Sequence, residues 1–324
     1  MKIRWIAAAS MLALSLAACS SGANGGKNAD SNGGFDPGNK LTMVVPMNAG
    51  GGSDQSGRAI AKGLEEVTGK SFSVENLPGS GGAVGYGDFM GKKGDASYLL
   101  ATETAMINLP LTQKVPFTWE SFTPIMKVGQ DSSVMIVPGD SRYATCKDVV
   151  DAAKSGAVKV AVSGGVTGND AIQFNLIQKD QNVKFQQVSY ESGGDAITAL
   201  MGKHVDVAVT NPSEVMGQLE SKDVKALCVI AQERYKYDQL KDIPTTVEQG
   251  INVTFSQFRG IIAPGDLAPE AKEYWVNAAK KYAETEAYHK YMNDNFMQED
   301  PMFGDDFSAY LKQYQTDLAA GIGK

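Results

Sequence analysis

Short apolar runs alternate with amphipathic stretches from residue 41 onward, and this alternation predicts strands followed by helices. The run 41–45 (LTMVV) reads as a strand. Residues 53–67 follow as a helix, because Ile60, Leu64 and Val67 recur on one face. Further strands are expected at 71–75, 98–102 and 123–128. Alternating strands and helices of this kind are typical of βαβ units in a mostly parallel sheet.

A second alternating set follows residue 134. We interpret the apolar run 134–137, which ends at Pro138-Gly139, as a strand that crosses between two domains. The run 260–264 is also stopped by a proline and is expected to be the return crossing. Residues 269–321 are expected to be helical and to pack on the first domain. Strands are predicted at 158–163, 185–190, 205–210 and 224–231, with helices near 147–155, 170–179, 194–202 and 212–219.

The predicted fold class is therefore α/β, with two doubly wound α/β domains joined by two crossing strands. The roughly 285 residues that follow residue 39 suit two domains better than one. We place residues 40–135 plus 257–324 in domain 1 and residues 136–256 in domain 2. Two crossings make a hinge with an inter-domain cleft, and ligands in open α/β sheets bind beyond the carboxyl ends of strands. The loops that follow strands are thus the candidate site.

The N-terminal segment has the pattern of an export signal followed by a linker. Two basic residues precede an apolar run at 5–16 that is too short to span a bilayer, and Ala17-Ala18-Cys19 follows. This order resembles a bacterial lipobox, which implies a signal peptide at 1–18 and lipidation of Cys19; the alternative is an ordinary signal peptide with a chance cysteine. Residues 19–39, rich in Ser, Gly and Asn, are expected to be a flexible tether. The sequence thus predicts an extracytoplasmic protein, lipid-anchored to the cell membrane on the periplasmic side or at the cell surface.

The net charge and the cysteine content restrict the classes of molecule that the protein is expected to bind. The net charge of −7 argues against nucleic acid, because binding its phosphates needs clustered basic residues. No stretch after the signal reaches membrane-spanning length. With Cys19 assigned to the lipid, Cys146 and Cys228 remain; they fit no metal-site spacing, and the sequence leaves open whether they form a disulfide. Two buried free thiols is the interpretation that we favour.

The most informative loop, residues 46–54 (PMNAGGGSD), follows the first strand and opens a helix. Three consecutive glycines leave backbone N–H groups unobstructed and the helix N-terminus adds partial positive charge, so the loop predicts an anion site. A nucleotide P-loop is excluded, because Arg58-Ala59 stands where Lys and Ser/Thr would be needed. A small carboxylate fits an exported protein, and the alternative is a tight turn without a ligand. The candidate ligand-binding residues are Asn48, Ala49, Gly50, Gly51, Gly52, Ser53 and Asp54.

A second glycine-rich loop, residues 163–169 (SGGVTGN), has the same position in domain 2, after a strand and before a helix. Two such loops, facing each other, suit a ligand with an acid group at each end. The glycine-dense turn 78–82 lacks the GxGxxG spacing and is expected only to shape the chain. The candidates in the second loop are Ser163, Gly164, Gly165 and Thr167.

Signals for catalysis are few. The two histidines, His204 and His289, lack metal-ligand spacing, and neither a GxSxG nor an HExxH motif occurs. We therefore expect a protein that is not an enzyme and that binds no cofactor or metal. An extracytoplasmic hydrolase is the alternative from a different functional class.

At these loops the chain resembles the periplasmic receptor family of tripartite tricarboxylate transporters, also called the Bug family. The resemblance covers nearly the whole exported part, and its short motifs become specific through their order and spacing. The segments that carry it are 45–58, 74–85, 188–193, 202–206, 243–250 and 260–264, which read VPMNAGGGSDQSGR, VENLPGSGGAVG, VSYESG, GKHVD, IPTTVEQG and GIIAP.

The resemblance implies a type II periplasmic-binding-protein fold that closes on one small organic acid, a mono-, di- or tricarboxylate. It implies that the first loop and the second-domain loop, residues 163–167, hold carboxylates, and that Thr104 and Tyr190 line the cleft. It also implies delivery of the solute to a membrane permease pair. We expect the receptor to be a monomer. A sensor that presents its solute to a membrane kinase is the alternative among binding proteins.

The chain departs from the family pattern at two places. Residues 167–170 (TGND) replace a Gly-Ser-x-x-His pattern that is frequent in the second loop. Arg259 stands before Gly260, where an aromatic residue is common. Arg259 either pairs with a ligand carboxylate in the cleft or faces solvent, and the sequence leaves both open. The departures bear on the identity of the solute, which the sequence does not name.

Overall fold

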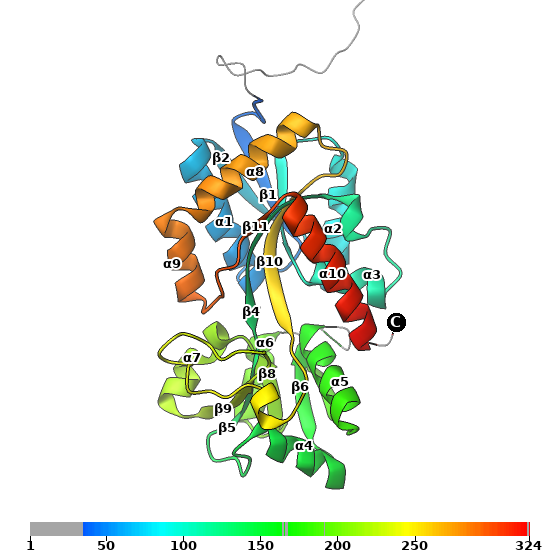
Figure 1. Ribbon diagram of the computed structural model, residues 1–324, viewed down its shortest axis with the longest axis vertical. Helices are drawn as coiled ribbons and strands as arrows, with labels where there is room; N and C mark the ends of the chain where they lie inside the picture. Colours follow the sequence, from blue (N-terminus) through cyan, green and yellow to red (C-terminus); the bar gives the residue numbers. More distant parts are fainter. Residues whose placement is uncertain (1–34, 164, 166–167, 191, 323) are drawn as a thin grey trace, which may run out of the picture. The chain divides into compact units, whose positions relative to one another are not determined.

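The computed structural model describes residues 35–163, 165, 168–190, 192–322 and 324 (Figure 1). The chain divides into two units, Met1–Asp36 and Pro37–Lys324, and all the helices and strands named below belong to the second. The predicted signal peptide, Cys19 and nearly all of the tether lie outside the described residues. Among the described helices, none combines the length and the apolar character needed to cross a membrane.

The first of two sheets has six strands in the order β11-β4-β10-β3-β1-β2. Strand β1 pairs in parallel with β2 and β3, whereas β10 lies antiparallel between β3 and β4. The parallel pairing of β1 with β2 follows from the helical connection that the sequence predicts at residues 53–67. The strands are β1 (Lys40–Val45), β2 (Ser71–Asn76), β3 (Tyr98–Glu103), β4 (Thr123–Ser132), β10 (Ser256–Ala263) and β11 (Met302–Phe303).

Helices cover both faces of this sheet (Figure 1). On β1, Met43 and Val45 belong to one apolar cluster and Val44 to another, because successive side chains point to opposite faces. One face is covered by α1 (Gly52–Thr68), α8 (Pro269–Ala283) and α9 (Glu286–Asp294), and the other by α2 (Ala83–Phe89), α3 (Ala105–Thr112) and α10 (Asp305–Ile322). We call this sheet with its helices the first lobe.

The second sheet has five strands in the order β7-β6-β8-β5-β9, and with its helices it forms the second lobe. Its faces also alternate: Ile136 packs toward α6, and Met135 packs with α4 and α5. The elements are β5 (Val134–Pro138), α4 (Cys146–Ser155), β6 (Lys159–Ser163), α5 (Asn169–Gln181), β7 (Gln186–Tyr190), α6 (Gly193–Met201), β8 (Val207–Thr210), α7 (Pro212–Ser221) and β9 (Val224–Val229).

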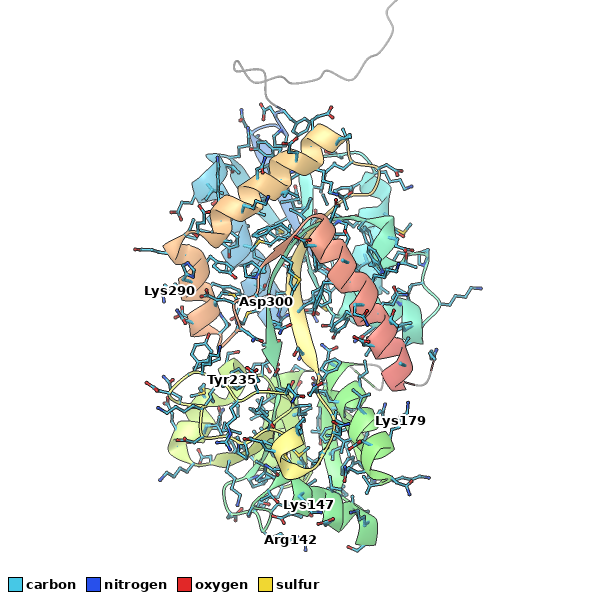
Figure 2. The ribbon with its side chains drawn as sticks, viewed as in Figure 1. Arg142, Lys147, Lys179, Tyr235, Lys290 and Asp300 are labelled. Carbon is cyan, nitrogen blue, oxygen red and sulfur yellow. A yellow bond between two sulfur atoms is a disulfide. The ribbon has the colours of Figure 1, made fainter. Side chains whose placement is uncertain are left out.

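The chain crosses between the lobes twice. Strand β4 ends at Ser132 and β5 begins at Val134, so the first crossing is made at Ser133. The run 134–137, which we expected to cross, instead lies wholly in the second sheet, where it pairs with β8 and β9. The Tyr235 hydroxyl donates to the Ser132 carbonyl and accepts from its N–H, and Figure 2 shows Tyr235 at this junction. The return leads into β10, whose preceding residue Phe255 still donates its N–H to Ile230 of the second lobe.

The structure confirms the α/β fold class with two sheets joined by crossing strands. Helices α2 and α3 were not predicted, because α2 contains two glycines and α3 contains Pro110. Gly85 in α2 is required by packing: a side-chain carbon there would lie 2.7 Å from the backbone of Pro46. The helical C-terminal part also contains the short strand β11. The exact domain boundaries remain a prediction.

The expectation of two free thiols is wrong, because Cys146 and Cys228 form a disulfide bond. Cys146 is the first residue of α4 and Cys228 lies in β9, with their Cα atoms 6.0 Å apart. Both are fully buried. They are separated by 82 residues in the sequence, so the pairing depends on how α4 packs against the sheet, which spacing along the chain does not reveal.

Candidate ligand-binding site

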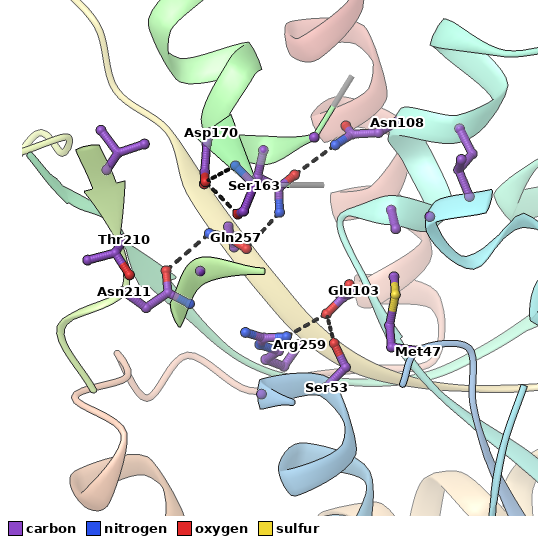
Figure 3. Close-up of a pocket in the computed structure, with 18 of the residues that line it drawn as sticks. Met47, Ser53, Glu103, Asn108, Ser163, Asp170, Thr210, Asn211, Gln257 and Arg259 are labelled. Atoms are coloured by element: carbon purple, nitrogen blue, oxygen red, sulfur yellow. Dashed lines mark hydrogen bonds and ion pairs between the residues drawn. The ribbon is translucent and has the colours of Figure 1, made fainter. Parts of the chain in front are cut away.

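Two adjoining cavities lie where the loops of the two lobes meet. The first has a volume of about 390 Å³ and is shown in Figure 3, and the second has a volume of about 870 Å³. Both receive residues from the start of α1 in the first lobe and from the starts of α6 and α7 in the second. These positions follow the carboxyl ends of strands, as predicted. The residues shared by both cavities are Gly52, Gly193, Asn211, Glu214 and Arg259.

The first glycine-rich loop lies at the cavities. Residues 48–52 are exposed and line the second cavity, and Gly52 and Ser53 line the first. Gly50 has a φ of 85°, a conformation that favours glycine. Its N–H donates to Asp54 Oδ2 at 2.9 Å, so this amide is already engaged within the protein.

Asp54 lines neither cavity and instead orders the loop. Its buried carboxylate accepts from Arg58 Nε at 3.0 Å, from Asn76 Nδ2 at 3.0 Å and from the Gly50 N–H. The hydrogen bond from Arg58 is the main reason that the pKa of Asp54 is lowered to about 2. The ionised Asp54 side chain therefore holds the loop and the start of α1 in position without lining a cavity itself.

Arg259 lines both cavities and is buried, with 8% of its surface exposed, so it does not face bulk solvent. Its Nη1 donates to Glu103 Oε2 at 2.5 Å, and Ser53 Oγ donates to the same oxygen at 2.7 Å (Figure 3). Its Nη2 lies 3.7 Å from Asp131 Oδ2. Burial by itself would lower the pKa of Arg259, but the surrounding carboxylates raise it above its usual value. The guanidinium therefore stays charged and is already paired with protein carboxylates.

Two buried carboxyl groups in this region have raised pKa values. Burial raises the pKa of Asp131 to about 6, with Arg259 opposing the shift and Glu214 and Glu103 adding to it. Burial likewise raises the pKa of Asp170 to about 6, although Ser163 donates both its N–H and its hydroxyl to the Asp170 carboxylate. Both groups are thus harder to ionise than an exposed aspartate.

The second glycine-rich loop reaches the site in part. Ser163 lines the first cavity, but its hydroxyl donates to Asp170 Oδ2 at 2.6 Å. Gly165 is described and lines neither cavity, whereas Gly164 and Thr167 lie outside the described residues. The proposal that this loop faces the first one is therefore supported at Ser163 alone.

Thr104 and Tyr190 do not lie at the cavity walls. Thr104 is fully buried at the start of α3, and Tyr190 is the last residue of β7. Their predicted role in ligand binding therefore stays a prediction without support from the two cavities. The neighbours Glu103 and Ala105 line the first cavity in place of Thr104.

A chain of four side-chain amides borders the first cavity and was not predicted (Figure 3). Asn108 Nδ2 of α3 donates to Asn169 Oδ1 of α5 at 2.8 Å. Asn169 Nδ2 donates to Gln257 Oε1 of β10 at 2.7 Å, and Gln257 Nε2 donates to Asn211 Oδ1 at 3.1 Å. All three bonds join the two lobes, and the bond between Asn108 and Asn169 does so without the crossing strand β10. Its partners lie 61 residues apart in the sequence, so no local pattern reveals the bond.

Glu214 was also missed, although it lies in the first turn of a helix that follows a strand. It lines both cavities, and its Oε2 accepts from Thr210 Oγ1 at 2.9 Å. Glu103 is the last residue of β3, and Asn211 and Glu214 follow the end of β8, so a polar side chain near a strand end is the signal that could have identified them. Within the residues that the structure describes, no three His, Cys, Asp or Glu side chains are grouped as a metal site requires.

Comparison with known proteins agrees with this geometry. Residues 57–317 match the family described as "Tripartite tricarboxylate transporter family receptor". The "UPF0065 protein in tcbD-tcbE intergenic region" of Pseudomonas sp. (strain P51) is 28% identical over 216 residues, which cover 65% of this chain and 63% of the relative. This chain therefore matches a little under two thirds of that relative's length.

Two solved structures share the fold. MatC from Rhodopseudomonas palustris with bound malate has a TM-score of 0.76 at 18% identity, over 87% of this chain and 98% of that one. Rpa4515 from R. palustris with adipate has a TM-score of 0.78 at 17% identity, over 88% and 97%. The family match covers well over half of the chain, and the chain thus belongs to the tripartite tricarboxylate transporter receptor family.

Proposed function

We propose that this protein is an extracytoplasmic solute receptor that captures a small carboxylated organic acid and delivers it to a tripartite tricarboxylate-type permease. The observation that carries the proposal is the exposed glycine-rich loop at residues 48–52, which lines a cavity between the lobes at the start of α1. Malate and adipate in the two R. palustris proteins give the class of ligand to test.

In this proposal the ligand carboxylate lies at the start of α1. The N–H groups of residues 48–52, apart from that of Gly50, which already donates to Asp54, and the positive end of the helix dipole attract a negative charge there. Ser53, Ser163 and Arg259 complete the wall, and each of them is bonded to a carboxylate of the protein. No step of bond making or breaking is involved, and the protein turns over no substrate.

Closure of the two lobes follows from the placement of the wall. The cavity residues come from both lobes, so a ligand that contacts both stabilises the closed arrangement over the open one. Bending at Ser133 and ahead of Ser256, where the chain crosses between the sheets, supplies the hinge. Release to the permease then requires the lobes to part.

The lipid anchor belongs to the same proposal. Lipidation at Cys19 and a tether to residue 39 hold the receptor near the permease in the membrane. Changing Cys19 to alanine is expected to move the mature protein from the membrane fraction to the soluble fraction. Mass spectrometry of the N-terminal peptide is the direct measurement, and an unmodified Cys19 rejects the anchor without touching the binding function.

A thermal-shift screen tests the binding function. Mono-, di- and tricarboxylates are compared with sugars and simple cations, because a ligand that binds only the folded protein raises its melting temperature. A response to one or more organic acids is the expected result. A response only to sugars or cations contradicts the proposal, and mass spectrometry of a co-purified small molecule names the natural ligand.

A further inference from the structure

The cavities carry more negative than positive charge. The first is lined by the carboxylates of Glu103, Asp170 and Glu214, and the second by those of Asp131, Asp294 and again Glu214. Arg259 supplies the cationic side chain in both linings, which contain no lysine or histidine. Each cavity therefore has three carboxylates against one guanidinium.

Arg259 does not offer an unpaired charge to an incoming dianion. One side of its guanidinium bonds Glu103 and the other faces Asp131, so its charge is already balanced. A ligand with two carboxylates and no cation would add negative charge to a surplus that exists before it arrives. Like charges this close repel one another strongly where water is displaced.

An unpaired acceptor lies at the same site and is independent of the carboxylates. Asn108 lines the first cavity with 5% of its surface exposed, and its nitrogen is committed to Asn169. Its Oδ1 has no hydrogen-bond partner among the residues that the structure describes. A buried carbonyl oxygen without a donor is costly, and a ligand N–H would remove the cost.

Asp131 Oδ1 is a second buried oxygen without a partner in the described part of the chain, and Asp131 lines the second cavity. Glu214, in contrast, is exposed to the cavities, with Thr210 holding one of its oxygens. A side-chain carbon added to Gly52 would lie 3.8 Å from both Glu214 Oε1 and Arg259 Nη2. The absence of a side chain at Gly52 thus keeps the space beside the Glu214 carboxylate open.

We propose that the solute carries a protonated amine in addition to its carboxylate, with Glu214 as the main partner of the ammonium group. This inference rests on the proposed receptor function and narrows its substrate class to amino acids and related zwitterions. The ammonium lies beside Gly52, where the Glu214 carboxylate accepts its N–H groups, and the free oxygen of Asn108 is left for a second donor group of the solute in the first cavity. The carboxylate lies across Gly52 at the amides of residues 48–52.

Matched acids that differ by one amine test the inference. Isothermal titration compares propanoate with alanine, succinate with aspartate and glutarate with glutamate, and malate is added as the hydroxyl counterpart of aspartate. The amine-bearing member of at least one pair is expected to bind about tenfold or more tightly than its partner. Equal or weaker binding by every amine-bearing member overturns the inference while the receptor function stands. If neither member of any pair binds, the inference fails together with the proposed carboxylate receptor.

Variants at α7 link the amine to Glu214. Glu214→Gln keeps an acceptor for Thr210 but removes the charge, and it is expected to weaken binding of the amine-bearing acid about tenfold. Glu220→Gln, an exposed change of the same kind on the same helix, is the control and is expected to bind as the unaltered protein does. Circular dichroism verifies that both variants fold. Unchanged or tighter binding of the amine-bearing acid by Glu214→Gln overturns the inference.

Discussion

Gly52 begins α1 beside two charged side chains of the cleft, Glu214 and Arg259. Its φ is not positive, so a larger residue fits the backbone but fills the space proposed for the solute. Gly52→Val is expected to fold normally and to weaken solute binding at least about tenfold, measured by isothermal titration. Gly217→Val, in an exposed position of α7 with nothing near its added carbon, is the control. Unaltered affinity in Gly52→Val would reject the role of the loop.

Asp131 and Asp170 give the stability of the protein a defined dependence on pH. Burial raises the pKa of each from 3.8 to about 6, so the folded protein binds these protons more tightly than the unfolded chain does. The free energy of unfolding that they contribute therefore rises as the pH falls from about 6 toward about 4. Urea denaturation over this range measures the effect.

Replacing Asp131 with asparagine removes one of the two carboxyl groups whose pKa is raised. The side chains of Arg259, Glu103 and Glu214 face this position and remain. The expected result is a smaller gain in stability on acidification than the unaltered protein shows. An identical pH profile in the two proteins would mean that Asp131 does not titrate in this range.

At the scale of elements, the Cys146–Cys228 bond ties the start of α4 to β9 across 82 residues. Closing a loop of this length restricts the unfolded chain, and its loss is expected to lower the free energy of unfolding by up to about 4 kcal/mol. The double variant with alanine at both positions measures this by urea denaturation. Solute binding serves as its control and is expected to persist, because neither cysteine lines a cavity.

Lys127 of β4 is fully buried and links β4 to the segment before β11 and to α10. Its Nζ lies 2.7 Å from Asp300 Oδ2 and 4.2 Å from the centre of the Tyr310 ring. Burial lowers the pKa of Lys127, with Asp300 opposing the shift. Asp300→Asn leaves the cation without its counter-charge and is expected to cost about 1–3 kcal/mol of stability.

Two comparisons isolate the effect of Asp300. Lys127→Met removes the buried charge itself and is expected to cost less than Asp300→Asn, because an apolar side chain of similar size needs no partner. Asp151→Asn breaks exposed ion pairs with Lys147 and Lys154 and is expected to have little effect. Thermal unfolding of the three variants gives the order, and equal losses would contradict the buried-pair argument.

The strands and most helices were predictable from sequence because their burial follows the period of the backbone. Helix α3 was not, since its apolar residues surround Pro110 and carry no clear amphipathic period. We predicted the first crossing in the run that forms β5, whereas the chain crosses at Ser133, before β5 begins. The two strands could not be told apart by sequence because both are apolar and only Ser133 separates them. An apolar run shows that a strand is buried but not which sheet it joins.

The location of the cavities was predictable, whereas the pairing of the charged groups that line them was not. The glycine-rich loop at residues 48–52 follows β1 and lines a cavity, as the position after a strand end predicts. The pairing of Arg259 with Glu103 joins residues 156 positions apart, and it decides whether the guanidinium is free for an anion. Contacts of that kind come from the packing of β10 beside β3, which no local pattern encodes.

At the scale of the whole receptor, the hydrogen bond from Asn108 to Asn169 holds the two lobes together on one side of the cleft. Asn108→Ala removes it and is expected to shift the lobes toward the open arrangement by about 1 kcal/mol. Small-angle X-ray scattering without ligand is expected to give a larger radius of gyration. Asn175→Ala, which loses bonds only within the second lobe, is the control and is expected to leave the radius unchanged.

The row of amides from Asn108 to Asn211 has a direction. The two inner members, Asn169 and Gln257, each give their nitrogen to one neighbour and receive the other at their oxygen. If the side-chain amide of either residue were rotated by 180°, its oxygen would face a neighbouring oxygen and its nitrogen a neighbouring nitrogen. All the amide dipoles of the row therefore have the same orientation along it. An oxygen ends it at Asn108 and an amide nitrogen ends it at Asn211. Neutral side chains thereby give one wall of the first cavity an electrical polarity that does not depend on any charged group.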